Sequence, residues 1–236
     1  MAEHLLTRKM ADVLANIRRA NRAPFHALGA RGARQAYEAA AEILEPPRAA
    51  LDRVEDIRIP TADGASLRAS VYASSSAVLP ALLHLHGGGF TIGSLETHDS
   101  LCRHHAGNHG IRRHTFAPAL RTRLSARCRK HRVVLRPVHR IRRPSRLRFA
   151  PLEANDLDGV APACVVLAEC DPLVDAGLAY ADRLRAAGVR VELELARGVT
   201  HDFIKLGRVL PEAAAAQAMI GAALRRAFDL NDATEP

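Results

Sequence analysis

The sequence lacks the features that mark membrane-spanning, secreted and many metal-binding proteins. No apolar run in its 236 residues approaches the about 20 residues that a membrane-spanning helix needs. The first segment, MAEHLLTRKMADVLANIRRA, is amphipathic and has no continuous apolar core, so we expect no signal peptide. The four cysteines contain no C-x-x-C pair; they are Cys102, Cys128, Cys164 and Cys170. These absences predict a cytoplasmic protein with reduced thiols, no metal and no cofactor.

Acidic residues are missing from one part of the chain, residues 111–148, which contains thirteen Arg and one Lys. The net charge of the whole chain is +9, yet outside this segment 20 basic residues stand against 25 acidic ones. A segment of this charge could neutralise phosphates, so nucleic-acid binding through 111–148 is an alternative function. The only aromatics in or beside it are Phe116 and Phe149, and it contains no known nucleic-acid-binding motif, which argues against nucleic acid as a partner.

Apolar periodicity predicts an α/β fold with a mostly parallel sheet and flanking helices. In the first half we expect helices, then three strands, then a further helix, at 3–20, 30–45, 53–60, 66–73, 78–85 and 97–109. In the second half strand and helix alternate, at 163–169, 175–187, 189–195 and 211–228. Between the halves, only the apolar residues 133–135 are typical of a strand, and we expect 111–148 to be the least ordered part of the chain.

A glycine motif, His86-Gly87-Gly88-Gly89-Phe90, directly follows the apolar strand 78–85. Acyl transfer places negative charge on a carbonyl oxygen, and backbone N–H groups in a glycine loop can approach that oxygen closely. The longer string HGGGFTIGSLETHDSLCRHHAG resembles the hormone-sensitive-lipase group of α/β-hydrolase esterases. The resemblance implies hydrolysis of small acyl esters by Ser-His-Asp chemistry, with Gly87 and Gly88 in the oxyanion hole and His86 and Gly89 completing the motif.

Two further segments resemble the same family. Asp171 lies in ECDPLVD just after the strand 163–169, and His201 lies in GVTHDF just after the strand 189–195. Considered alone, Asp171 could cap a helix and His201 could be a surface loop residue. With the glycine motif, the resemblance implies that Asp171 is the catalytic acid and His201 the base. Both follow the carboxyl ends of strands, where α/β sheets carry their sites.

The nucleophile of that family, a serine in G-x-S-x-G, is absent. Arginines stand two residues to either side of Ser125, and Arg143 and Leu147 flank Ser145 in the same way. Such side chains would crowd the strained turn that carries the nucleophile. The remaining serines lack the motif as well, at 66, 70, 74, 75, 76, 94 and 100. We therefore expect the chain to be inactive as an esterase.

The resemblance covers residues 1–110 and 149–236, which predicts a single hydrolase-like domain that is truncated internally. We expect cap helices in 1–47, an N-terminal α/β half in 48–110, the anomalous segment 111–148 and a C-terminal half in 149–236. The fourth to sixth strands of the family's sheet should be missing, so that strand 78–85 loses both neighbours. A frameshift with loss of the middle would explain the segment's composition; a genuine basic insertion is the alternative.

The helix 97–109 carries four potential metal ligands, Cys102, His104, His105 and His109. His105 and His109 are four residues apart and could share one face of the helix. No paired cysteines accompany them, so we expect exposed histidines there and no metal site.

Overall fold

The computed structural model divides the chain into two compact units. The first comprises Met1–Asn21 and His139–Ala223, and the second comprises Arg22–Val138 and Leu224–Pro236. The structure describes residues 3–61, 64–77, 80–89, 91–109, 112–116, 127–129, 132–134, 151–154 and 156–228.

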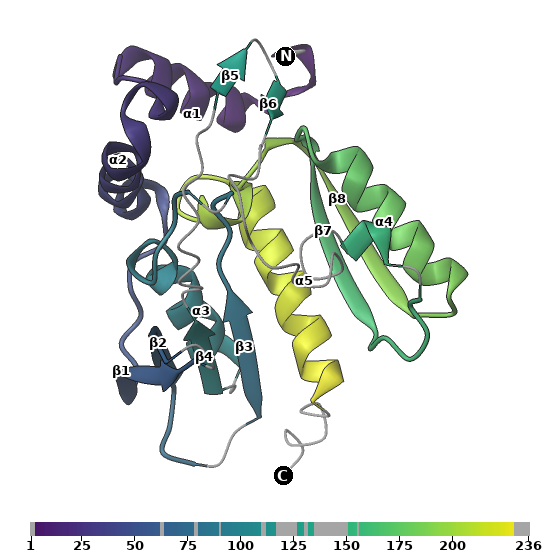
Figure 1. The fold of residues 1–236 in the computed structure, drawn as a ribbon. Coiled ribbons are helices and arrows are strands. Elements are labelled where there is room, and N and C mark those ends of the chain that lie inside the picture. Colours follow the sequence, from purple (N-terminus) through teal and green to yellow (C-terminus); the bar gives the residue numbers. More distant parts are fainter. Residues whose placement is uncertain are drawn as a thin grey trace. The chain divides into compact units, whose positions relative to one another are not determined.

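The first unit is built around a parallel βαβ arrangement (Figure 1). Strands β7 (Ala163–Cys170) and β8 (Val191–Thr200) pair in parallel, and helix α4 (Val174–Ala186) connects them and packs against both. The unit also contains helix α1 (Arg8–Arg19) and most of helix α5 (Pro211–Ala227). Short helical turns occur at Glu3–Leu5, Pro151–Glu153 and Phe203–Lys205.

Apolar burial holds α4 against its surroundings in this unit. The side chains of Ala154, Leu157, Leu184 and Val189 form one buried cluster. Helix α4 ends where the sequence predicts, because Gly188 adopts φ +76°, a left-handed conformation that stops a helix and that glycine adopts readily. The strand–helix–strand order predicted for 163–195 is therefore confirmed, although β8 continues to Thr200.

The N-terminal helix of the first unit is fixed at its start. The Thr7 hydroxyl accepts a hydrogen bond from the backbone N–H of Met10 at 3.3 Å, which caps α1. Met10 and Val13, one turn apart, turn into the interior and are buried. The predicted helix 3–20 is thus a short turn followed by α1.

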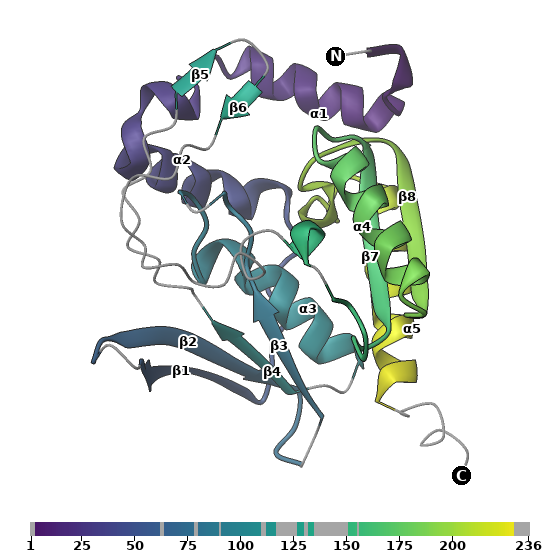
Figure 2. The same cartoon turned by 45° about the vertical axis from the view of Figure 1, so that its right-hand side comes forward.

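The second unit contains a four-stranded sheet with the order β1-β2-β4-β3 (Figure 2). Strands β1 (Arg53–Pro60) and β2 (Ser66–Ala73) are antiparallel, as are β2 and β4 (Arg112–Phe116), whereas β3 (Ala81–Leu85) and β4 are parallel. Helix α3 (Asp99–His109), preceded by a turn at Glu96–His98, packs on β2 and β4. The unit also contains a turn at Phe25–Ala27, helix α2 (Gly29–Leu44) and an antiparallel pair, β5 (Arg127–Arg129) with β6 (Arg132–Val134).

Two expectations for the middle of the chain are wrong. Strand 78–85, observed as β3, does not lose both neighbours, because β4 pairs with it in parallel from Ala81 to Leu85. Residues 133–135 are not the only strand-forming part of 111–148, since β4 and β5 also lie there, and the strand itself is β6. Backbone hydrogen bonding to a neighbouring strand requires no apolar period, which is why side-chain patterning missed these strands. The rest of 111–148, to which the expectation of low order refers, lies outside the described residues.

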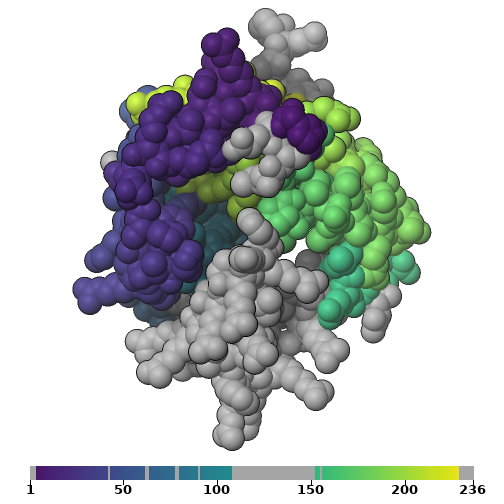
Figure 3. Space-filling model, turned by 90° about the horizontal axis from the view of Figure 1, so that it is seen from above, coloured from purple at the N-terminus to yellow at the C-terminus, as the bar shows by residue number. Residues whose placement is uncertain are grey.

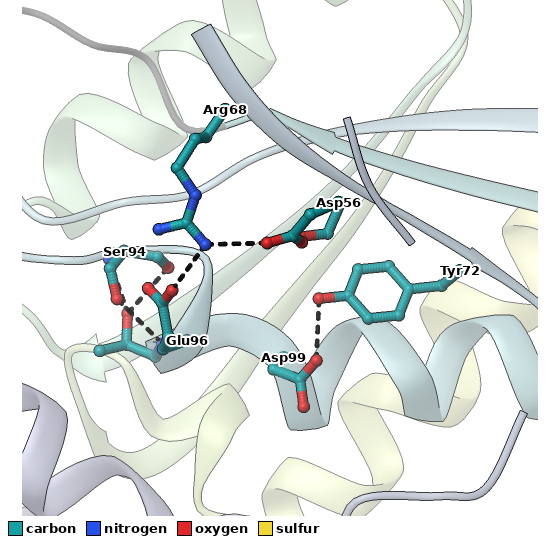
Figure 4. Close-up of polar contacts among 8 residues, drawn as sticks. Asp56, Arg68, Tyr72, Ser94, Glu96 and Asp99 are labelled. Atoms are coloured by element: carbon teal, nitrogen blue, oxygen red, sulfur yellow. Dashed lines mark hydrogen bonds and ion pairs between the residues drawn. The ribbon is translucent and has the colours of Figure 1, made fainter. Parts of the chain in front are cut away.

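The interior of the second unit combines an apolar cluster with a buried ionic group. Tyr72, Cys102 and Ala106 are buried together, with Leu51 packed against them. The Tyr72 hydroxyl donates to Oδ1 of Asp99 at 2.8 Å (Figure 4). The other carboxylate oxygen of Asp99 accepts from two arginines, Arg48 at 3.1 Å and Arg103 at 2.8 Å. Strand β2, the start of α3 and the segment before β1 are thereby joined.

Candidate functional site

Asp171 and His201 follow two residues that lie opposite each other on neighbouring strands. Cys170 ends β7 and Thr200 ends β8, and the two are Cα partners in the parallel ladder. Because both strands run in the same direction, the residues that follow them emerge at the same edge of the sheet. The parallel pairing of β7 and β8 therefore brings together two residues that are 30 positions apart.

The two side chains form a direct hydrogen bond. Nδ1 of His201 lies 2.7 Å from Oδ2 of Asp171. The other oxygen of Asp171, Oδ1, accepts the backbone N–H of Leu173 at 2.8 Å, which fixes the carboxylate on the turn that leads into α4. The side chain of Asp171 is 13% exposed and that of His201 is 62% exposed. A carboxylate on Nδ1 holds the imidazole in the tautomer that leaves Nε2 free to accept a proton.

The turn that carries His201 is tightly shaped. The next residue, Asp202, adopts φ +64°, which is uncommon for a residue other than glycine. The buried Phe203 and Lys205 follow it in a short helical turn, and Gln217 of α5 donates to the backbone oxygen of Ile204 at 2.6 Å. The backbone after His201 is therefore fixed by the burial of these two side chains and by the hydrogen bond from Gln217.

The glycine motif forms a tight loop directly after β3, as its sequence predicts. The Gly88 carbonyl accepts the N–H groups of both Thr91 and Ile92 at 3.0 Å. Gly88 adopts φ +132°, and a Cβ atom there would lie 1.9 Å from the Ile92 oxygen. A Cβ on Gly93 would lie 2.5 Å from the Gly87 oxygen. Both positions therefore require glycine for steric reasons, independently of any catalytic role.

Histidines surround the base of this loop, which the sequence pattern did not reveal. Nδ1 of His86 lies 2.7 Å from the Gly87 oxygen. Its ring stacks on the buried ring of His98 with centroids 5.3 Å apart, and the ring of His84 lies 5.8 Å from that of His98. His84 and His86 alternate along β3 and its end, and His98 precedes α3. Their juxtaposition depends on the fold, which explains why spacing along the chain gave no signal.

A second polar group missed by the sequence reasoning lies on β1, β2 and the turn before α3 (Figure 4). Nη2 of Arg68 donates to Oδ2 of Asp56 at 3.0 Å and to Oε1 of Glu96 at 3.1 Å. The Ser70 hydroxyl donates to the other oxygen of Asp56 at 2.6 Å. These hydrogen bonds from Ser70 and Arg68 lower the pKa of Asp56. Burial alone would raise the pKa of Glu96, but hydrogen bonds from its own backbone, Ser94 and Arg68 lower it.

Two of the four candidate metal ligands on α3 are buried. Cys102 and His105 are buried, so the expectation of exposed histidines is wrong at position 105. Within the described ranges, no group of three or more His, Cys, Asp or Glu residues could hold a metal ion. In that same part of the chain no helix is long and apolar enough to cross a membrane.

The predicted site residues thus fall into two groups. Asp171 and His201 are joined in the first unit, and the loop with His86, Gly87, Gly88 and Gly89 lies in the second. Phe90, the last residue of the motif, lies outside the described residues, as do the remaining parts of 111–148 that were considered for nucleic-acid binding.

Solved structures resemble this chain over nearly its whole length. An α/β hydrolase enzyme from the metagenome of Lake Arreo aligns over 94% of this chain and 99% of its own, with a TM-score of 0.75 and 23% identity. An esterase of Pyrobaculum calidifontis aligns over 94% and 98%, with a TM-score of 0.71 and 22% identity. The chain has an α/β-hydrolase fold. A family model of the alpha/beta hydrolase fold also matches residues 116–205, the part that contains both Asp171 and His201.

Curated relatives of this chain include named ester hydrolases. An ethyl acetate hydrolase of Pseudomonas putida is 28% identical over an alignment of 292 positions, gaps included, that covers 86% of this chain and 92% of the relative. A carboxylesterase of Mycobacterium tuberculosis is 46% identical over 73 residues, which are 31% of this chain and 23% of the relative. An arylesterase of Saccharolobus solfataricus is 41% identical over 80 residues, or 34% of this chain and 25% of the relative.

Proposed function

We propose that this α/β-hydrolase chain derives from a carboxylic-ester hydrolase of small acyl esters and has lost its nucleophile. In the parent reaction, His201 accepts the proton of the nucleophile through Nε2 and later returns it to the leaving alcohol. Asp171 fixes the tautomer of His201 and stabilises the imidazolium. Gly87 and Gly88 supply backbone N–H groups to the developing oxyanion. The names of the curated relatives support this substrate class.

The hydrogen bond between Nδ1 of His201 and Oδ2 of Asp171 carries the proposal. A surface histidine chosen at random has no reason to lie beside a carboxylate that is itself fixed by a backbone N–H. The pair stands at the carboxyl edge of two parallel strands, the usual position of an α/β site. Its order along the chain, acid before base, is the order of α/β-hydrolases.

The missing serine is why we propose that the chain is inactive. No G-x-S-x-G string occurs in the sequence. The hydroxyls of two serines in the second unit are already committed to partners, that of Ser70 to Asp56 and that of Ser100 to the Pro46 oxygen at 2.5 Å. Cys170 precedes Asp171, but burial and the neighbouring charge of Glu169 raise the pKa of its thiol, which disfavours the nucleophilic thiolate.

We further propose that the chain is shortened internally and forms a single domain, with cap helices in 1–47. The alignment with the Pseudomonas putida protein extends over 292 positions, more than the 236 residues of this chain, which supports gaps within it. Helix α1 belongs to the same unit as β8, and the N–H of Thr7, the residue before α1, donates to the Gly198 oxygen at 2.9 Å; this contact supports a cap role for α1. In Figure 3 the darkest purple residues, at the start of the chain, lie beside the green part of the same unit.

Hydrolysis of short-chain p-nitrophenyl esters tests the proposal. We expect the rate of ester hydrolysis with the protein to equal the rate in buffer alone and the rate with a His201→Ala variant, since no residue can form the acyl-enzyme. Turnover well above buffer that disappears in His201→Ala would overturn the inactivity. Sequencing the gene across codons 105–150 tests the internal loss separately: a hydrolase reading frame with G-x-S-x-G there would show that the serine was never lost.

A further inference from the structure

The register between β7 and β8 shifts just before the Asp171–His201 pair. Ala168 lies opposite Ala196, but the next paired residues are Cys170 and Thr200. Glu169 alone therefore faces three residues of β8, at 197–199. Such a bulge leaves backbone groups without partners in the ladder. It also advances β8 by two residues relative to β7, which decides where His201 emerges beside Asp171.

The Glu169 side chain supplies the partner that the bulge removes. Oε2 of Glu169 accepts the backbone N–H of Gly198 at 2.8 Å, and Oε1 accepts from Nη1 of Arg197 at 3.2 Å. Gly198 is buried, so its N–H would be costly to leave without an acceptor. Arg197 is 79% exposed, and an ion pair at that exposure contributes little. The bond to Gly198 is therefore the one that matters.

Gly198 is held from its other side as well. Its carbonyl accepts the N–H of Thr7 at 2.9 Å, and its φ of +67° is in the left-handed region. A Cβ atom at this position would lie 2.7 Å from the Thr7 nitrogen. His201 comes three residues after Gly198, just past the end of β8, and Thr200 before it donates to the Met10 sulfur at 3.6 Å. The backbone leading to His201 thus has fixed partners on both sides.

We propose that Glu169 is a positioning residue for the Asp171–His201 pair. Its carboxylate accepts the N–H of Gly198, which lies in the bulge. This hydrogen bond fixes the register of β8 against β7, and the register decides whether His201 follows β8 beside Asp171. Glu169 touches neither reacting atoms nor the imidazole itself. The inference rests on the proposed function of the pair, but its test needs no ester turnover.

Proton NMR of the full-length protein gives the readout. A hydrogen bond from Nδ1–H of His201 to Asp171 yields a downfield resonance, recorded at low temperature and assigned by its loss in His201→Ala. In Glu169→Ala we expect that resonance to disappear and the Gly198 amide to exchange at least about tenfold faster, because its acceptor is gone. Glu169→Gln should retain both signals, because an amide oxygen still accepts. Glu169→Asp should lose them, because the shorter side chain cannot reach.

Controls separate this role from general destabilisation. Glu194→Ala removes an exposed glutamate from β8, the strand that carries Gly198, and Arg197→Ala removes only the exposed ion pair; both should keep the resonance. An unchanged resonance in folded Glu169→Ala would overturn the proposal. If that variant does not fold, Glu169→Asp decides, and a retained resonance there overturns it equally. Absence of the resonance in the unaltered protein would instead contradict the proposed Asp171–His201 site.

Discussion

The hydroxyl of Tyr72 donates to Oδ1 of Asp99 at 2.8 Å, and both residues are buried. Tyr72 lies on β2, and Asp99 begins α3. The guanidinium of Arg103 lies over the Tyr72 ring, 5.8 Å from its centroid, and also binds Asp99. Helix α3 is therefore attached to the sheet through polar groups that remain satisfied without water.

This contact predicts a loss of stability at high pH. Burial, and then the negative charge of Asp99, raise the pKa of Tyr72 well above its ordinary value of 10.0. Above pH 10 the unfolded chain releases the tyrosine proton while the folded chain retains it, so rising pH favours unfolding. We expect Tyr72→Phe to cost about 1–3 kcal/mol at neutral pH and less as the pH rises above about 10. Urea unfolding of both proteins between about pH 8 and pH 11 measures the difference in their free energies of unfolding. A difference that does not change with pH would contradict the prediction.

The glycine loop predicts different tolerance at adjacent positions. Gly88→Ala should lower the free energy of unfolding by about 1–3 kcal/mol or more, because its Cβ would collide with the Ile92 carbonyl at an unfavourable φ. Gly87→Ala is the matched control, since nothing lies within 4 Å of a Cβ there. Thermal unfolding of both variants should separate them. Equal stability of the two would show that the loop does not have the conformation described.

Strand β3 predicts a tendency to associate. In the described part of the chain it ends the sheet, and Leu83 and Leu85 on one of its faces are 56% and 64% exposed. An uncharged apolar edge strand readily pairs with another chain. Leu83→Lys should raise the highest concentration at which the protein remains monomeric, as measured by light scattering. The free energy of unfolding should change little.

Val54→Lys is the control for that experiment. Val54 is 42% exposed on β1 at the opposite end of the same sheet, where charged neighbours such as Arg53 and Glu55 already oppose edge pairing. We expect this substitution to leave association unchanged. An equal gain in solubility from both substitutions would indicate a general charge effect rather than association through β3.

Local periodicity was sufficient for most elements. The strand-like segment 66–73 after the turn signal Asp63-Gly64 predicted β2 with its observed bounds. The helix and strand patterns of 163–228 matched β7, α4, β8 and α5 to within a few residues at most ends, although β8 extends five residues further, to Thr200. These segments bury apolar side chains at regular intervals or in runs, so their apolar residues indicate the element that they form. Strand β4 has no such spacing and was missed, because its place depends on backbone pairing with β2 and β3.

The sequence alone determined the helices, the strands outside 111–148, the glycine loop and the absence of a G-x-S-x-G serine, because each depends on neighbouring residues. It also identified Asp171 and His201 as candidates from their positions after strands. Only the tertiary structure decided that their side chains meet, and that Glu169 faces the bulge beside them. The register of two strands separated by a helix depends on the packing of that helix and on the partner of one buried N–H, and neither can be deduced from residues adjacent in the sequence.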